Sequence, residues 1–292
     1  MTRLVYGRYS PDPDLDPSVF RVIELSRRQL PLLQNLRHLA AYELEPHIMW
    51  NIPPFLGPKL SSFSLTSRFG EGTFESMFVL ASLKTHSPSL EHLHVSGLDP
   101  SPSVVCGTVC SLKHLRSLSL CLSDIPLTAE CIDHLSSLSN LTELTATITK
   151  DGLAHRASAA GREISFASLW ILTIRTDSWV VANDFCEVYL RPSSLCILEI
   201  SVIDVPSSRY IEELFTTLRR RCSVISLKSI TLLLLSVEQV GDDALLDRIL
   251  DPDALRPLFP FFNLEKLKIE GFMKVNDALA DGMASAWPRL KS

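Results

Sequence analysis

A hexad of the form Leu-x-x-Leu-x-Leu recurs along the chain and limits its fold more than any other feature. It is clearest at Leu90–Val95, Leu115–Leu120, Leu169–Ile174, Leu195–Ile200 and Leu264–Ile269. Successive hexads start 24 to 37 residues apart, and a repeat of this length predicts a solenoid whose neighbouring units share one core. The first leucines of nine units and of a truncated tenth are Leu36, Leu60, Leu90, Leu115, Leu141, Leu169, Leu195, Leu227, Leu264 and Leu290.

The alternation within each hexad predicts a strand whose second and third apolar residues face the core. Between hexads the apolar residues take helical spacing, best seen in Ser208–Arg221 with its stripe of Ile211, Leu214, Phe215 and Leu218. Further helices are predicted over Glu75–His86, with Phe78, Val79 and Leu83 as its stripe, over Glu130–Leu138 and over Asn276–Trp287. Strands alternating with helices predict an α/β leucine-rich-repeat solenoid, with a curved parallel sheet on the concave face and helices on the convex face.

The repeat is irregular, because the position eight residues after the first leucine lacks the asparagine or cysteine of regular repeats. We expect residues 1–35 to form an N-terminal loop and capping helix, and residues 36–292 to form the repeats. In that helix Asp16 would be the N-cap and Pro17 the first residue, with Val19, Ile23 and Leu30 facing the sheet edge. A calcium loop beginning at Asp12 is excluded, because Pro17 and Ile23 stand where glycine and glutamate are required.

Composition argues against several functional classes. The net charge of −5 disfavours binding to nucleic acid or to a membrane surface, since both call for a basic footprint. The run Arg219–Arg221 lies at a predicted helix C-terminus, where cations suit the helix dipole. The start does not resemble a signal peptide, and the seven cysteines are odd in number and scattered. We therefore expect reduced thiols and a cytoplasmic or nuclear location.

Motifs for catalysis or for a cofactor are not evident in the sequence. His92 and His94 point the same way from one strand, but a metal site needs further ligands that the spacing does not supply. Cys106 and Cys110 are one helical turn apart and also lack two further ligands, so structural cysteines are the favoured interpretation. The sequence predicts a protein that is not an enzyme and that has no cofactor and no metal.

A solenoid of this class offers the strand residues between the core leucines to a partner protein. These residues are mostly small hydroxyls, with Arg175 and Glu199 the strongest candidates for directional contacts. The alternative, that serines and threonines only solvate an exposed sheet, stays open. We predict that the partner-binding residues on the concave face include His92, His94, Ser117, Ser119, Glu143, Thr145, Thr173, Arg175, Glu199, Lys266 and Lys268.

Four phrases carry a family resemblance: Leu30–Leu39, Leu56–Leu65, Ser87–Leu93 and Trp287–Ser292. They resemble the leucine-rich-repeat portion of F-box proteins from basidiomycete fungi. The resemblance implies the substrate-recognition part of an F-box (SCF) ubiquitin ligase, in which the F-box binds the cullin adaptor. No F-box segment precedes the repeats here, so adaptor binding would require an F-box outside this chain. The alternative is a free-standing scaffold or binding repeat without a ligase link; in either case we expect a monomer.

Overall fold

The computed structural model describes residues 2–7, 31–44, 46–67, 73–122, 125–154, 165–191, 194–204, 207–234, 249–270, 272–273 and 276–291. The capping helix expected between Asp16 and Leu30 lies outside these residues. The chain divides into two compact units, and each is described by itself. Unit 1 comprises Met1–Leu141 and Thr145–Thr147, and unit 2 comprises Thr142–Leu144 and Ile148–Ser292.

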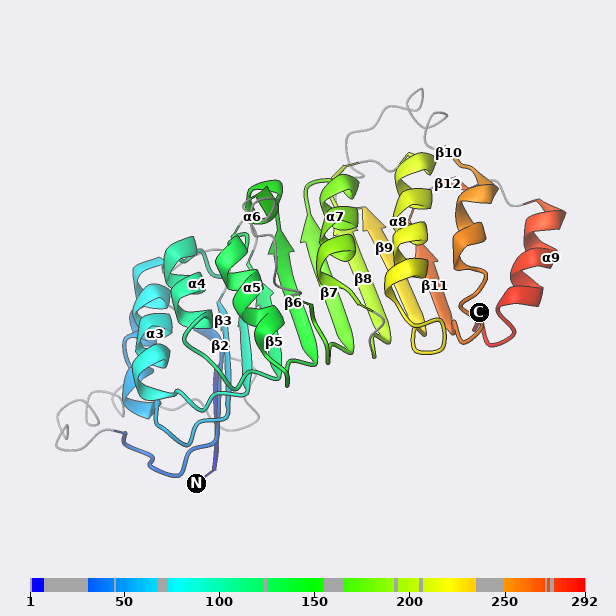
Figure 1. Cartoon of the computed structure of the whole chain (residues 1–292). Coiled ribbons are helices and arrows are strands. Elements are labelled where there is room, and N and C mark those ends of the chain that lie inside the picture. Colours follow the sequence, from blue (N-terminus) through cyan, green and yellow to red (C-terminus); the bar gives the residue numbers. More distant parts are fainter. Residues whose placement is uncertain are drawn as a thin grey trace. The chain divides into compact units, whose positions relative to one another are not determined.

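Unit 1 contains five parallel strands in chain order, with helices packed along one face (Figure 1). The strands are β1 (Arg3–Gly7), β2 (His38–Leu44), β3 (Ser62–Ser67), β4 (His92–Ser96) and β5 (Ser117–Cys121). The connections carry α2 (Pro46–Met49), the 3-10 helix η1 (Pro53–Phe55), α3 (Thr73–His86), α4 (Pro102–Val109) and α5 (Ala129–Ser137). Strand β6 (Glu143–Ile148) is divided between the two units.

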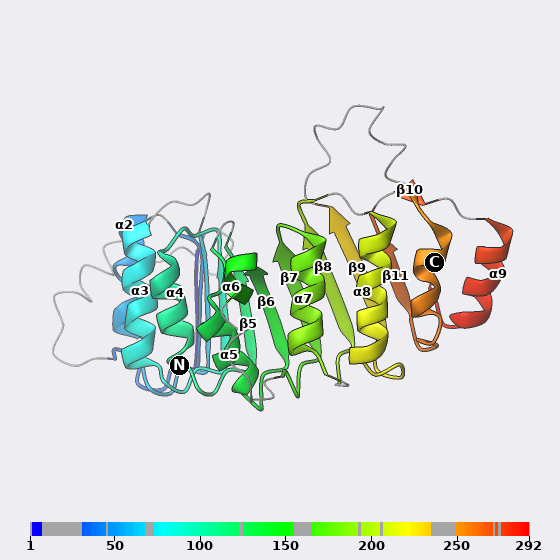
Figure 2. The ribbon, with the colours of Figure 1, turned by 45° about the horizontal axis from the view of Figure 1, so that its top comes forward.

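Unit 2 repeats the same plan, and its helices α7 and α8 lie over one face of its strands (Figure 2). Its parallel strands, in hydrogen-bonded order, are β7 (Ile171–Thr176), β8 (Ile197–Val202), β9 (Ser229–Leu234) and β11 (Lys266–Ile269). Its helices are α6 (Lys150–Ala154), α7 (Trp179–Tyr189), α8 (Ser208–Arg221), η4 (Pro252–Leu258) and α9 (Asp277–Ala286). A separate two-stranded sheet pairs β10 (Ile249–Leu250) with β12 (Phe272–Met273). The fold is an α/β leucine-rich-repeat solenoid.

The predicted register is confirmed. Every strand from β2 to β9, and β11, starts two residues after a predicted first leucine. All nine of those leucines are buried, from Leu36 to Leu264, with at most 2% of any side chain exposed. From β2 to β9 the inward strand residues of each hexad are buried as well, for example Leu118 and Leu120 on β5, whereas Leu267 and Ile269 on β11 are only partly buried. Because full burial of one leucine stabilises a fold by about 1.5–3 kcal/mol, this stacked series forms the main core of each unit.

A ladder of backbone hydrogen bonds joins successive repeats at the strand entrances. In seven of the repeats the carbonyl of the residue that follows the first leucine accepts two N–H groups from the next repeat. In unit 1, for example, Glu91 O accepts from Arg116 N at 2.7 Å and from Ser117 N at 3.0 Å. In unit 2, Lys228 O accepts from the N–H groups of Glu265 and Lys266. The segment that begins at Leu290 also joins the ladder, since Lys291 N donates to Glu265 O.

Residues 3–7 correct the expectation of a loop at the start of the chain. They form β1, which pairs with β2 in the register Leu4↔Leu39 and Tyr6↔Ala41. Thr2 O accepts the N–H groups of Arg37 and His38 and therefore occupies the ladder position of an additional repeat. The signal was present as Met1-x-x-Leu4-x-Tyr6, in which only one of the three apolar positions holds leucine.

Helix starts follow local sequence signals. Thr128, Ser178, Ser207 and Asn276 are N-caps, and each side chain accepts a hydrogen bond from a backbone N–H in the first turn. Helix α8 has the predicted bounds, and its four stripe residues are fully buried. The predicted stripe of α3 was wrong at Phe78, which is 44% exposed and packs against Trp50 in a tilted arrangement with ring centroids 5.0 Å apart.

Candidate binding surface

The candidate site is the sheet face, defined as the strand side chains that alternate with the core residues. It is the face predicted to be concave. All eleven residues predicted to bind a partner lie on strands, and none is buried. They comprise His92 and His94 on β4, Ser117 and Ser119 on β5, Glu143 and Thr145 on β6, Thr173 and Arg175 on β7, Glu199 on β8, and Lys266 and Lys268 on β11.

In unit 1 the sheet face is a grid of three rows across β3, β4 and β5. The rows are Ser62–His92–Ser117, Ser64–His94–Ser119 and Thr66–Ser96–Cys121. Parallel pairing sets neighbouring rows two residues apart along each strand, so all nine side chains emerge on one face. None of them is a carboxylate, ammonium or guanidinium, so this grid offers hydroxyl, thiol and imidazole groups.

Hydrogen bonds tie the grid together across the strands. His94 Nδ1 lies 3.0 Å from Ser119 Oγ, and Ser119 Oγ lies 3.6 Å from Cys121 Sγ. In the next row the Ser96 hydroxyl donates to Thr66 Oγ1 at 3.1 Å. Partial burial lowers the pKa of His94 below its ordinary 6.5, so its imidazole is mainly neutral at pH 7.

A histidine beside a serine also has a bearing on catalysis. A nucleophilic serine needs a base that a further group, usually a carboxylate, holds in the correct orientation. The strand register places Ser64, rather than an acid, beside His94 on β3. On β3, therefore, the register position next to His94 holds a hydroxyl group and no carboxylate.

In unit 2 the sheet face is mixed in character. One row pairs Ile171 with Ile197, and the next places Glu199 between Thr173 and Thr231. At β11 the Lys268 ammonium donates to Glu270 Oε1 at 2.7 Å, and this hydrogen bond lowers the pKa of Glu270. Apolar and charged groups therefore lie close together on this part of the face.

Two strand side chains that alternate with the core residues, and that this alternation would place on the exposed face, are instead buried. Ser201 is 3% exposed and Thr231 is 7% exposed. Sequence reasoning also missed Trp170, which directly precedes β7 and is 52% exposed. The signal was an aromatic residue next to the first leucine of its hexad, where the other units carry mostly polar residues. An exposed tryptophan beside a candidate surface is a typical anchor for a protein partner.

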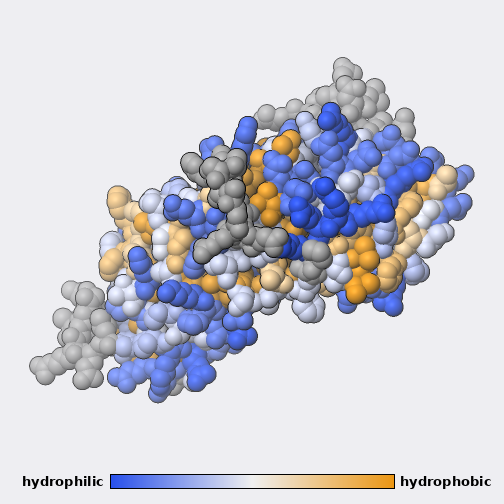
Figure 3. Space-filling view, in the orientation of Figure 1, coloured by the Kyte–Doolittle hydropathy of each residue, from blue (hydrophilic) through white to orange (hydrophobic). Residues whose placement is uncertain are grey.

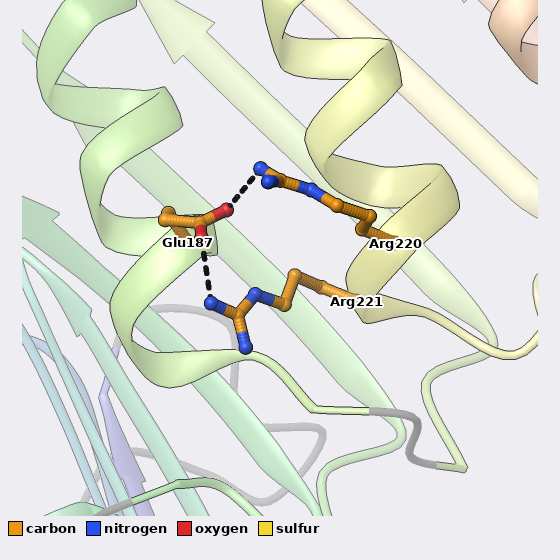
Figure 4. A network of polar contacts seen from close by, with 3 residues as sticks. All are labelled: Glu187, Arg220 and Arg221. Atoms are coloured by element: carbon orange, nitrogen blue, oxygen red, sulfur yellow. Dashed lines mark hydrogen bonds and ion pairs between the residues drawn. The ribbon is translucent and has the colours of Figure 1, made fainter.

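On the helix side, the arginines at the end of α8 are engaged within unit 2. Glu187 of α7 accepts from Arg220 Nη2 and from Arg221 Nη2, each at 2.6 Å (Figure 4). The two arginines therefore link α7 to α8 within unit 2. Apolar side chains do reach the surface, but on the face seen in Figure 3 hydrophilic groups break them into separate patches.

Metal and membrane sites were searched among the residues that the structure describes. Within them, no group of three or more His, Cys, Asp or Glu side chains could hold a metal ion. None of the described helices is long and apolar enough to cross a bilayer.

Comparison with known proteins gives only distant similarity. No protein-family model matches the sequence, and no curated protein matches it. A crystal structure of the yeast Rad7–Elc1 complex matches with a TM-score of 0.49 and 16% identity, covering 88% of this chain and 68% of that chain. The crystal structure of an internalin from Listeria monocytogenes matches with a TM-score of 0.33 and 14% identity, and the match covers 88% of this chain and 80% of that chain. Similarity at this level carries no conclusion about function.

Proposed function

We propose that this chain is a non-catalytic protein-binding domain whose partner docks on the sheet face. One observation carries the proposal: the strands present partly exposed side chains on the face opposite the helices. A regular array of strands supplies many such positions at fixed spacing. Extended repeat surfaces of this kind suit a macromolecular partner better than a small molecule, which needs a closed pocket.

The chemistry of the face fits a protein partner. In unit 1 the small hydroxyl side chains let another backbone approach closely, and each hydroxyl both donates and accepts hydrogen bonds. In unit 2 the charged groups Arg175 and Glu199 would give direction, and Trp170 would supply an apolar anchor. We therefore expect hydrogen bonding to dominate at unit 1, and apolar and charged contacts to dominate at unit 2.

Two steps test the proposal. Proximity labelling in cells would identify a partner, which is then purified and titrated against the purified chain. Ser119→Arg places a long cation in the middle of the unit 1 grid and should weaken binding at least tenfold, about 1.4 kcal/mol. Thr85→Arg is the matched control, because Thr85 is an exposed residue of α3 on the helix side.

Glu199→Arg reverses a charge on the unit 2 face and forms a second probe. Binding that Ser119→Arg and Glu199→Arg leave unchanged would exclude the sheet face as the docking surface. An equal loss with Thr85→Arg would point to the helix side instead. Circular dichroism of each variant must match that of the wild-type chain, since all three positions are at least partly exposed.

The finer proposal is that the partner is a substrate of an F-box type ubiquitin ligase. It rests on the sequence phrases around Leu60 and Leu90 that resemble F-box proteins. Pull-down of the cullin adaptor by the product of the longest transcript tests it. Failure of both that product and this chain to bind the adaptor would favour a free-standing scaffold.

A further inference from the structure

Helix α3 of unit 1 carries a largely apolar stripe on its outer side, although its inner side already packs into the core of that unit. Phe74, Phe78, Ala81 and Thr85 follow one another at spacings of four, three and four residues, which places them in one line along the helix. All four are exposed, and none carries a charge. A helix that is apolar on both sides is normally covered on both, so the outer stripe calls for a partner.

Trp50 widens this surface toward α2. It directly follows α2, which lies beside α3 (Figure 2), and its ring packs against Phe78 with centroids 5.0 Å apart. Phe74 is 74% exposed, and Trp50 and Phe78 are each nearly half exposed. In the part of unit 1 that the structure describes, no other large apolar side chain is exposed to this extent. The exposed aromatic rings are therefore gathered on one surface, as at sites of protein association.

We propose that the α3 surface, made of Trp50 and the four stripe residues, binds a second copy of this chain. The two α3 helices pack antiparallel about a two-fold axis, which brings the same surface of each copy together. An uncharged stripe of this kind is complementary to itself in such a contact. The proposal replaces the expected monomer with a dimer, and it does not depend on the function proposed for the sheet face.

The charges of α3 favour the antiparallel arrangement. Glu75 lies in the first turn, and Lys84 and His86 lie in the last turn. Antiparallel pairing about the helix midpoint sets Glu75 level with Lys84 of the second copy, and it also opposes the two helix dipoles. Parallel pairing would instead bring like charges together at both ends. Charge complementarity between the copies therefore selects a two-fold axis perpendicular to the helices.

The sizes of the stripe residues fit the same arrangement. An axis through the midpoint of α3 sets Phe78 level with Ala81 of the second copy. It likewise sets Phe74 level with Thr85 of the second copy. A large side chain therefore meets a small one at each of these levels, which is the complementarity that close helix packing needs. The axis that matches the charges thus also matches the side-chain volumes.

The area of this surface predicts a weak dimer. A full aromatic side chain has about 200 Å² of surface, so the rings of Trp50, Phe74 and Phe78 leave about 330 Å² uncovered in each copy. With the rest of the stripe, the two copies bury roughly 1,000 Å² together, close to the lower limit of a specific interface. We therefore expect a dissociation constant on the order of tens of micromolar. A partner titration at about 1 µM chain then measures the monomer, so Thr85→Arg remains a control there.

Sedimentation velocity of the full chain tests the proposal between about 1 µM and about 300 µM, which brackets the expected dissociation constant. The weight-average sedimentation coefficient of the wild-type chain should rise from that of a monomer towards that of a dimer. Ala81→Glu places a carboxylate opposite Phe78 twice in each dimer and should weaken association at least about 30-fold. Ala280→Glu is the matched control, because Ala280 is an exposed alanine of α9 in unit 2 and its replacement should leave the dimer unchanged.

Two further variants keep the test independent of one substitution. Phe74→Ala removes the most exposed ring without adding a charge and should weaken association about tenfold. Glu75→Lys should weaken it about three- to tenfold, and Lys84→Glu in the same chain should restore it. A sedimentation coefficient that stays constant over the whole range would overturn the proposal, as would a dimer that Ala81→Glu and Phe74→Ala leave intact. A double variant no tighter than Glu75→Lys alone would overturn the antiparallel arrangement.

Discussion

Replacing Leu172 by alanine is the sharpest test of the register. Leu172 lies on β7 with none of its side chain exposed, and its partner on β8 is the equally buried Leu198. The substitution removes three carbon groups, worth about 2.4 kcal/mol at about 0.8 kcal/mol each. The cavity left between stacked repeats adds to this loss, so the free energy of unfolding should fall by about 3–4 kcal/mol.

The matched control is the adjacent residue. Ile171 has a side chain of the same size on the same strand, but it points to the sheet face and is only half-buried. Ile171→Ala should cost about 1 kcal/mol or less, chiefly through its cross-strand contact with Ile197. The two variants differ by one position in sequence, so their difference isolates the direction in which each side chain points.

Urea unfolding followed by circular dichroism measures both losses. With a slope of about 2 kcal/mol per molar urea, Leu172→Ala should lower the midpoint by about 1.5–2 M. Hydrogen exchange should show the added opening concentrated in β7 and β8, since each repeat contacts mainly its neighbours. An equal loss for both variants, or a larger loss for Ile171→Ala, would show that β7 is set in the opposite register.

Three further substitutions test local features. Glu187→Gln should destabilise the chain by about 1 kcal/mol at pH 7, measured by thermal unfolding, because it weakens the contacts with Arg220 and Arg221. The hydrogen bond from Arg221 holds the pKa of Glu187 in the folded chain below its ordinary 4.5. The stabilisation by Glu187 is therefore fully present above pH 4.5 and should vanish as the pH falls through the pKa of the folded state. A difference in stability between the wild-type chain and Glu187→Gln that persists at pH 2 would contradict this account. Gly97→Ala should cost about 3 kcal/mol or more, because φ is +65° and the new Cβ would lie 2.1 Å from Ser67 O. Gly107 lies on the exposed side of α4, and no atom lies within 4 Å of a Cβ added there. Gly107→Ala should therefore stabilise the chain by about 0.5–1 kcal/mol. If both glycine substitutions changed the free energy of unfolding in the same direction, this account would be refuted.

The sequence predicted the strands because leucine burial and strand alternation are both local signals. Leu90, Leu115 and Leu195 each mark a strand that begins two residues later. The same reasoning missed β1, because Met1 and Tyr6 take the places of leucine in its hexad. The burial of Ser201 and Thr231 could not be predicted either, since exposure on a sheet face depends on what packs over it and not on the strand pattern.

Helix faces were predicted less evenly. In α8 the stripe residues are all apolar and the rest are polar, so only one orientation buries them. In α3 apolar residues occur on several sides, so Val79, Leu80 and Leu83 are buried while Phe78 packs against Trp50 at the surface.

The entrance ladder explains why the register survives irregular repeats. A ladder carbonyl such as Glu91 O accepts two N–H groups from the next repeat. These backbone hydrogen bonds do not depend on which side chains the residues carry. Backbone pairing therefore fixes the spacing, while the apolar residues decide which face is buried. It follows that the sheet face contributes little to stability, and its residues are free to vary with the partner. Ser119 and Leu118 are neighbours on β5, yet changes at Ser119 should act on binding and changes at Leu118 on folding.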